Sequence, residues 1–465
     1  MNRINIMRSC KILLYFFILE VILTSCKVTG NYKRPAGIAE NGLYRDIKTN
    51  DSATIADIPW KQLFSDSLLL NLIGEGIDQN LDLKIAMARI KEAQANLQSG
   101  NAAFLPTLDL HATLTDQKPA NNNPGISNYY QLYASSGWEI DLWGKIKSAK
   151  RAALALLMQS EAYRRAVQTQ LVADIATNYY ILLAYDAQLQ VTLKTLENRK
   201  LDVGIMKQLK ESDVVTGAAV VQSEANYYSV EVTIPDLKQN IRVAENTLCN
   251  LLGRSPGSIA RDSIYNQLIH SGLQTGVPFQ LLANRPDVRE AEYQLRYYFE
   301  LTNLAKTYFY PSLTITANEG FSNGKISNLF NSTAVFGNIV GGLAQPILNH
   351  GLNTQRLRVA KAQQEEALAA FKKTLLNAGQ EVSNALANYR AATDKVEFRS
   401  QQIVYLQKAV EFTKELLKYT ANTNYTDVLT SEQSLLAAQL NSISDKLQQL
   451  LANVTLYRSL GGGWR

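Results

Sequence analysis

The chain has 465 residues, of which 46% are hydrophobic and 19% charged, and its formal net charge is +6. This composition is typical of an ordered protein with a large core, and it excludes a disordered or collagen-like chain. It also gives no support to nucleic-acid binding, because no basic run with interleaved aromatic residues forms a stripe for phosphates.

The first 25 residues are predicted to be an export signal of the lipoprotein type. Three basic residues precede a short apolar segment, 12–22, which leads into Leu23-Thr24-Ser25-Cys26. The apolar segment is shorter than the roughly 20 residues that span a bilayer, which argues against a transmembrane helix. The four residues after it resemble the bacterial lipobox, whose cysteine is acylated and becomes the first residue of the mature chain. Cys26 is therefore the predicted lipidation site, and Lys27 in place of an aspartate favours the outer membrane under the sorting rules that this resemblance implies.

An extended, lipid-anchored segment is expected at 26–67, and two similar halves follow it. Phe104-Leu105-Pro106-Thr107-Leu108 recurs as Phe309-Tyr310-Pro311-Ser312-Leu313, an offset of 311 − 106 = 205 residues. Leu252-Gly253 recurs as Leu460-Gly461, an offset of 460 − 252 = 208 residues. A repeat of this length is a structural half and not a solenoid unit. The expected divisions are repeat 1 at 68–253, a linker at 254–276 and repeat 2 at 277–465.

Each half contains a predicted β-hairpin, at about 106–142 and about 311–347. Leu108, Leu110 and Leu114 alternate with polar residues, and the other segments repeat this period of two. Strands of about ten residues suit a tilted crossing of a bilayer. Alternation alone fits a half-buried soluble sheet equally well, but the lipoprotein signal favours the membrane. Because open sheet edges are not tolerated in hydrocarbon, several copies of the chain must share one barrel.

Long helices are predicted after each hairpin. No proline occurs between Gly144 and Pro235 or after Gly351, and apolar residues from Leu171 to Leu196 follow the 3.5-residue spacing of a coiled coil. A helix over 145–201 would be about 85 Å long at 1.5 Å per residue, more than twice the thickness of the hydrocarbon core, so it must extend into water. An ordinary soluble bundle is the alternative, but it leaves the adjoining membrane-like strands unexplained.

Five short motifs occur in a characteristic order along the mature chain. They are Gly30-Asn31-Tyr32-Lys33-Arg34-Pro35 after Cys26, Trp60-Lys61-Gln62-Leu63-Phe64, Trp138-Glu139-Ile140-Asp141-Leu142-Trp143-Gly144-Lys145, Asn284-Arg285-Pro286-Asp287-Val288-Arg289 and Leu460-Gly461-Gly462-Gly463-Trp464. Together they resemble the TolC-like outer-membrane efflux proteins, specifically the lipoprotein (NodT/OprM-type) branch. The resemblance implies a mixed α+β membrane protein. Each chain would contribute four strands to a trimeric, twelve-stranded outer-membrane β-barrel, and its long helices would form a periplasmic α-barrel.

The resemblance also implies a function. It is that of a passive exit duct, a homotrimer that is lipid-anchored in the outer membrane and extends into the periplasm. Its partners would be a periplasmic adaptor (membrane fusion) protein and an inner-membrane transporter of the RND type, without a cofactor. An enzyme finds little support, because the three histidines lack metal-ligand spacing and no phosphate loop or catalytic triad pattern occurs. A structural or adhesive coiled-coil lipoprotein without transport is the remaining alternative, and it does not explain the hairpins.

Two turns between long helices match the periplasmic tips at which the family docks its adaptor. They are Asp213-Val214-Val215-Thr216 and Ala421-Asn422-Thr423-Asn424, and neither contains the glycine that is usual there. Asp213 can adopt the left-handed conformation that such a turn requires, whereas Ala421 cannot do so cheaply. Asn422 is therefore expected to make the second turn.

The pore constriction is assigned from the same resemblance to Asp427, Thr430 and Thr423. Asp427 matches a position whose carboxylates form a ring that narrows the closed pore, where three charges would attract cations and repel anions. Thr430 replaces a second acidic residue, so fewer charges are expected. The alternative is that Asp427 is a capping or solvated residue near a helix start. Ala219 holds the matching place in repeat 1, so the gate is predicted where the two halves differ.

Overall fold

The computed structural model describes residues 28–35, 43, 45, 54–116, 128–268, 280–419 and 425–465. The predicted export signal, 1–25, and Cys26 lie outside the described residues, so both assignments stay predictions. The chain folds into two compact units. Unit 1 consists of Met1–Ala36, Arg89–Ser160 and Glu290–Phe371, and unit 2 consists of Gly37–Ala88, Glu161–Arg289 and Lys372–Arg465.

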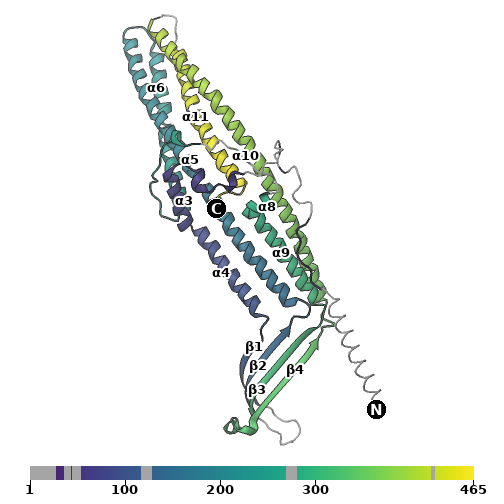
Figure 1. Cartoon of the computed structure of the whole chain (residues 1–465). Coiled ribbons are helices and arrows are strands. Elements are labelled where there is room, and N and C mark those ends of the chain that lie inside the picture. The colour runs from purple at the N-terminus through teal and green to yellow at the C-terminus, as the bar shows by residue number, and fades with distance from the viewer. Residues whose placement is uncertain are drawn as a thin grey trace. The chain divides into compact units, whose positions relative to one another are not determined.

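Unit 1 contains one antiparallel sheet with the strand order β1-β2-β3-β4, visible in Figure 1. The strands are β1 (Thr107–Asp116), β2 (Asn128–Ile140), β3 (Ser312–Asn323) and β4 (Val335–Ala344). The two hairpins of the repeat join through β2 and β3, with Trp138 opposite Ile315. Within the described residues β1 and β4 each pair on one side only, so closure into a barrel needs other copies of the chain.

One face of this sheet is apolar and exposed. Leu108 is 78% exposed, Ile339 79% and Leu343 67%. The strand register places these side chains on the same face as Ile315 and Leu132. The exposed Glu319 is the charged residue of β3 on this face. A largely apolar surface of this kind marks contact with a partner or a membrane, and alternation with a polar face is typical of outer-membrane strands.

Helices follow the strands of unit 1 after matching glycines. Gly144 precedes α5 (Lys145–Glu211) with φ 77°, and Gly351 precedes α10 (Leu352–Tyr419) with φ 75°. Both values lie in the left-handed region that favours glycine. At the start of α5 the Asp141 carboxylate accepts hydrogen bonds from the backbone N–H groups of Ile146 and Lys147, at 3.0 and 2.8 Å. The repeat is therefore visible in the local structure of each strand-to-helix turn.

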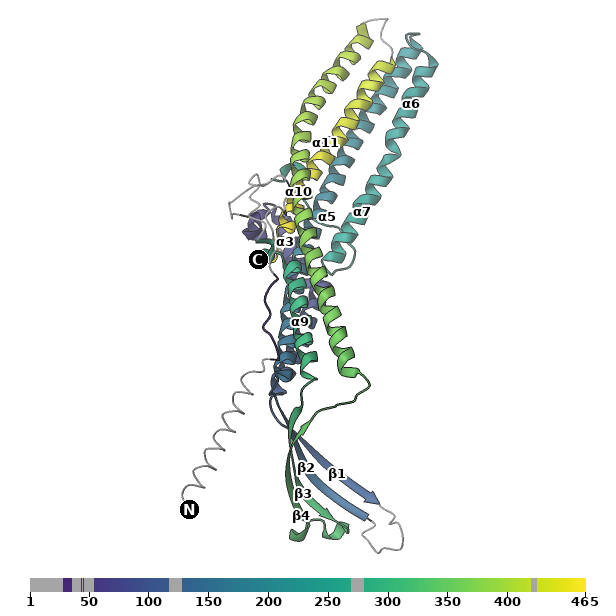
Figure 2. The same ribbon diagram turned by 90° about the vertical axis from the view of Figure 1, so that its right-hand side faces the viewer.

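Unit 2 is helical, and Figure 2 shows its parts of α5, α6, α10 and α11 running side by side. Its buried side chains include Leu171, Ile175 and Leu182 of α5 and Leu375 and Val382 of α10, each at most 4% exposed. The three side chains of α5 have the coiled-coil spacing predicted for that helix. The other helices of four or more residues are α2 (Trp60–Leu63), α3 (Ser67–Gln79), α4 (Leu81–Ala102), α6 (Gly217–Glu231), α7 (Thr233–Leu251), α8 (Leu281–Asn284), α9 (Pro286–Thr307) and α11 (Tyr425–Ser459).

Across the described part of the chain, no helix combines the length and the apolar character needed to cross a membrane.

Two of the sequence motifs pack against each other in unit 2. The Trp464 indole donates a hydrogen bond to the Asn284 carbonyl at 3.1 Å, and the Arg285 guanidinium donates one to the Ser459 carbonyl at 2.9 Å. A side chain at Gly461, which has φ 95°, would lie 2.6 Å from the Asn284 carbonyl carbon. Pro286 begins α9, as its fixed φ favours. Both motifs therefore have a structural explanation.

Candidate functional site at the helix tips

The first tip ends α5 with a left-handed residue. Asp213 has φ 55°, the conformation expected of it from the sequence. Its N–H donates a hydrogen bond to the Lys210 carbonyl at 3.0 Å, and the Val214 N–H donates one to the Leu209 carbonyl at 2.9 Å. This pair of bonds is a Schellman motif, in which the last carbonyls of a helix are satisfied by the residues that follow it. Asp213 thus performs the structural task of the missing glycine.

The second tip, Ala421-Asn422-Thr423-Asn424, lies outside the described residues. The expectation that Asn422 makes this turn, and the place of Thr423 in the constriction, therefore stay predictions.

Asp427 and Thr430 are both exposed in the first turns of α11. Residues three apart lie on the same face of a helix, so the two side chains share one surface. The Thr430 hydroxyl donates a hydrogen bond to the Thr426 carbonyl at 2.8 Å. Among the residues that the structure describes, the Asp427 carboxylate has no hydrogen-bond or ion-pair partner, and its position in the first turn is favourable for a negative charge. The carboxylate is thus available to a second chain or to an ion.

A buried apolar cluster holds the start of α11 beside the first tip. It consists of Met206 of α5, Val220 of α6, and Tyr425 and Val428 of α11, which are between 2% and 8% exposed. Burial raises the pKa of Tyr425 to about 12. Ala219, the counterpart of Asp427 in repeat 1, packs against this cluster. One repeat therefore presents a small apolar side chain to the interior where the other presents a carboxylate to solvent.

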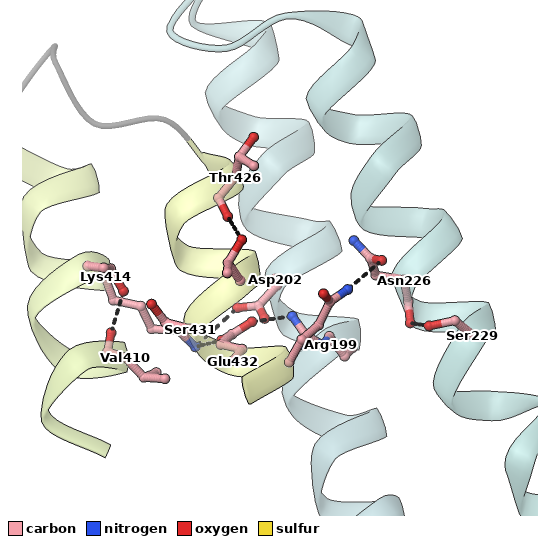
Figure 3. Close-up of polar contacts among 12 residues, drawn as sticks. Arg199, Asp202, Asn226, Ser229, Val410, Lys414, Thr426, Ser431 and Glu432 are labelled. Carbon is pink, nitrogen blue, oxygen red and sulfur yellow. Dashed lines mark hydrogen bonds and ion pairs between the residues drawn. The ribbon is translucent and has the colours of Figure 1, made fainter. Parts of the chain in front are cut away.

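Four charged side chains form a network that joins three helices, shown in Figure 3. The Arg199 guanidinium of α5 donates to the Glu432 carboxylate of α11. The Lys414 ammonium of α10 lies 2.5 Å from Glu432 Oε1 and 3.4 Å from Oδ1 of Asp202, which is on α5. The side chains of Arg199, Asp202 and Glu432 are only 3%, 11% and 10% exposed. We call these four residues the ion-pair network.

Burial and neighbouring charges shift the pKa values of two members of the network, Asp202 and Lys414. Burial raises the pKa of the Asp202 carboxyl, and repulsion by Glu432 raises it further, against the attraction of Lys414 and Arg199. The second oxygen of Asp202 is buried without a hydrogen-bond partner. Burial lowers the pKa of Lys414, but its hydrogen bond to Glu432 and the charges of both carboxylates outweigh burial and leave that pKa raised. Removing the Glu432 carboxylate would leave the buried Arg199 guanidinium without its partner, which is strongly destabilising.

The same position in repeat 1 carries a much more exposed ion pair. Glu224 is the counterpart of Glu432, since 432 − 224 = 208, the offset between the C-terminal motifs of the two halves. Glu224 lies 2.8 Å from the Lys207 ammonium, with side chains 41% and 55% exposed. Glu224 is on α6 and Lys207 on α5, which form one helical hairpin. Glu432 of α11 likewise binds Lys414 of α10, but it also binds Arg199 of α5, which belongs to repeat 1.

The ion-pair network was not predicted from the sequence. One signal could have found it, because Arg199 occupies the next position of the 3.5-residue seam that runs through Leu171 and Leu196. A charge at a core position of a coiled coil requires a buried partner. The partners come from helices more than 200 residues further along the chain, and nothing in the sequence pairs them.

No cluster of three or more possible metal ligands occurs among the described residues.

A cavity of about 450 Å³ lies beside the network. Its lining includes Thr192 and Arg199 of α5, Asn226 of α6, and Gln433 and Leu436 of α11. The Asn226 side-chain oxygen accepts a hydrogen bond from the Gln433 amide at 3.4 Å, while its own amide nitrogen is buried without a partner. The three helices are therefore incompletely packed next to the buried charges.

The sequence matches a known family over most of its length. The family described as outer membrane efflux protein matches residues 72–254 and 277–462. The chain is 26% identical over 472 residues to the cation efflux system protein CusC of Escherichia coli O6:H1, a comparison that covers 99% of this chain and 100% of that protein. It is 27% identical over 448 residues to the probable outer membrane lipoprotein SilC of Salmonella typhimurium, which covers 95% of this chain and 97% of SilC.

A solved structure shares the fold. The open state of the MtrE outer membrane channel of Neisseria gonorrhoeae has a TM-score of 0.85 at 23% identity, and the match covers 95% of this chain and 99% of that one.

Proposed function

Because the chain belongs to the outer membrane efflux protein family, we propose that the helix tips described above form the periplasmic gate of an exit duct. The protein is the outer-membrane channel of a tripartite efflux system, which conducts substrates from an inner-membrane pump and its adaptor. Three chains form a twelve-stranded barrel in the outer membrane, continued by a barrel of long helices in the periplasm.

The constriction is assigned to Asp427, with Thr430 and Thr423 as further lining residues. The observation that carries this assignment is the exposed Asp427 carboxylate without a partner among the described residues, on a helix start held by a buried cluster. In a trimer three such carboxylates would approach one axis, where they favour cations and resist close contact. Thr430 adds a hydroxyl in place of a second charge, so the ring carries three carboxylates and not six.

The ion-pair network is assigned as the latch of the closed state. It ties α11, which carries Asp427, to α5 through buried charges. Moving the start of α11 away from α5 must separate Glu432 from Arg199, and the neighbouring cavity provides room for such movement. A channel with this fold, MtrE of Neisseria gonorrhoeae, has been solved in an open state.

The duct binds an adaptor and works with an inner-membrane pump, and a lipid attaches it to the membrane. The adaptor docks at the two tips, and the exposed Val214 of the first tip, 62% exposed, offers it an apolar contact. The pump is of the RND type, the duct performs no catalysis of its own, and Cys26 carries the lipid. The lipobox-like sequence before Cys26 supports the lipid assignment.

Conductance of the purified trimer in planar bilayers tests the constriction. We expect a small, cation-selective conductance, because a ring of three carboxylates lines the narrowest part. Asp427→Asn should raise the conductance and lower the cation selectivity, and Thr430→Asp should do the opposite by adding a second acidic ring. If both variants keep the conductance and the reversal potential of the unmodified channel, Asp427 does not line the constriction.

A further inference from the structure

The polar face of the sheet carries one row of aromatic side chains. His111, Tyr133, Gly320 and Phe336 lie directly opposite one another across the four strands. The rings of His111 and Tyr133 stack with centroids 5.0 Å apart and planes at 22°. The rings of Tyr133 and Phe336 are 6.0 Å apart and tilted by 59°. The row therefore reaches from β1 to β4.

Gly320 allows the row to be continuous. A Cβ atom at this position would lie 2.5 Å from Tyr133 Cβ and 2.3 Å from the Leu132 carbonyl oxygen. No side chain fits there, so the Tyr133 ring can approach Phe336 across β3. The two adjacent rows on the same face are polar, with Asn318 donating to Asn338 at 3.0 Å on one side and Gln131 donating to Ser322 at 3.3 Å on the other.

This face lines the interior of the barrel. The opposite face is apolar and exposed, as lipid contact requires, and the interior face of an outer-membrane barrel is polar. Three chains therefore place three copies of the row around one lumen. The aromatic row lies between two polar rows whose side chains hydrogen-bond to each other, and it is on the face that lines the lumen.

The charged residues of the four strands indicate which class of ligand the row would bind. None of the four strands contains a lysine or an arginine. Asp109 lies two residues from His111 in β1, so its carboxylate is on the same face as the row. Aromatic ring faces attract cations, and a nearby carboxylate adds to that attraction.

We propose that the row formed by His111, Tyr133 and Phe336, with Asp109 beside it, is a binding site in the barrel lumen for planar aromatic cations. A flat cationic ring system can contact these rings while its charge is offset by Asp109. The site rests on the exit-duct function, because it needs a closed barrel with this face inside.

Equilibrium binding of ethidium to the purified full-length trimer tests the proposal. Fluorescence anisotropy should show saturable binding, and Tyr133→Leu should weaken it by about 2- to 30-fold, the range expected for loss of one cation–π contact. Tyr130→Leu is the matched control, since Tyr130 is in the same strand but on the apolar face. Asp109→Asn should also weaken ethidium binding. Tetraethylammonium, which has the charge but no flat ring, should displace ethidium only at a much higher concentration than a planar aromatic cation does, and naphthalenesulfonate, an aromatic anion, should bind more weakly.

Equal affinity in Tyr133→Leu and Tyr130→Leu would overturn the proposal. If Tyr133→Leu does not assemble, Phe336→Leu carries the same test, because its ring belongs to the same row and lies near the edge of the sheet. Normal trimers with normal conductance but no saturable ethidium binding would refute the lumen site alone. A protein that neither forms trimers nor conducts would refute the duct, and the site with it.

Discussion

Removing the Glu432 carboxylate should release the start of α11. Glu432 is 10% exposed and is shared by Arg199 and Lys414, and Arg199 is itself only 3% exposed. Glu432→Ala therefore leaves a guanidinium buried without its carboxylate. Breaking a buried pair in this way costs about 3–5 kcal/mol. Glu224→Ala removes the counterpart in repeat 1, whose partner Lys207 is 55% exposed, and exposed pairs contribute little.

Hydrogen–deuterium exchange of the purified trimer measures this difference locally. Amide exchange through local opening accelerates about tenfold for every 1.4 kcal/mol lost, so peptides over 425–436 should exchange about 100-fold faster or more in Glu432→Ala. In Glu224→Ala the equivalent peptides over 217–228 should change little.

A double variant separates the buried charge from other effects of truncation. Arg199→Leu with Glu432→Leu removes both charges and fills the space with apolar side chains, a replacement that is often neutral or stabilising. We expect it to regain most of the protection lost in Glu432→Ala, with Lys414 still paired to Asp202. Equal acceleration of exchange in Glu432→Ala and Glu224→Ala would contradict this prediction, and so would a double variant that exchanges as fast as Glu432→Ala.

Three further variants test other parts of the account. Burial raises the pKa of Asp202, so its charged form is disfavoured in the folded protein. Asp202→Asn should therefore raise the apparent melting temperature of the trimer at pH 7.5. This gain should shrink as the pH falls through the raised pKa, because the native carboxyl then takes up its proton. A lower melting temperature at pH 7.5 would contradict this. Asp213→Gly should stabilise the first tip by about 1 kcal/mol, since glycine adopts positive φ without strain. Asp213→Val should destabilise the tip in the same thermal assay. The reverse order of melting temperatures would show that the turn does not need φ 55°. Cys26→Ser should abolish labelling with palmitate while trimers still form, and continued labelling would place the lipid elsewhere.

The regular elements were predictable because each has its own period. Alternation of Leu108, Leu110 and Leu114 with polar residues predicts a strand with two different faces, and the structure places these leucines on the exposed apolar face. The 3.5-residue spacing from Leu171 predicts a long helix with a buried seam, which α5 has. Even the positive φ of Asp213 followed from the conformational tolerance of its residue type.

The functional contacts were not predictable in the same way. Pairing of β2 with β3, and the row from His111 to Phe336, depend on a register between strands about 180 residues apart. The ion-pair network combines Arg199 with Lys414 and Glu432 through the packing of three helices. In the sequence, Glu432 is the repeat counterpart of Glu224, and Arg199 is a charged residue at a position of the coiled-coil seam. Only the folded chain brings these two residues together.

Single-channel conductance of Glu432→Gln tests most directly whether the duct is closed by buried charges at its tips. Glutamine keeps the shape of glutamate and removes its charge, and Glu224→Gln is the matched control in repeat 1. We expect mostly closed trimers for the native protein and for Glu224→Gln, and frequent or larger openings for Glu432→Gln. Equal open probability and conductance in all three, or a stable monomer that never conducts, would contradict this expectation.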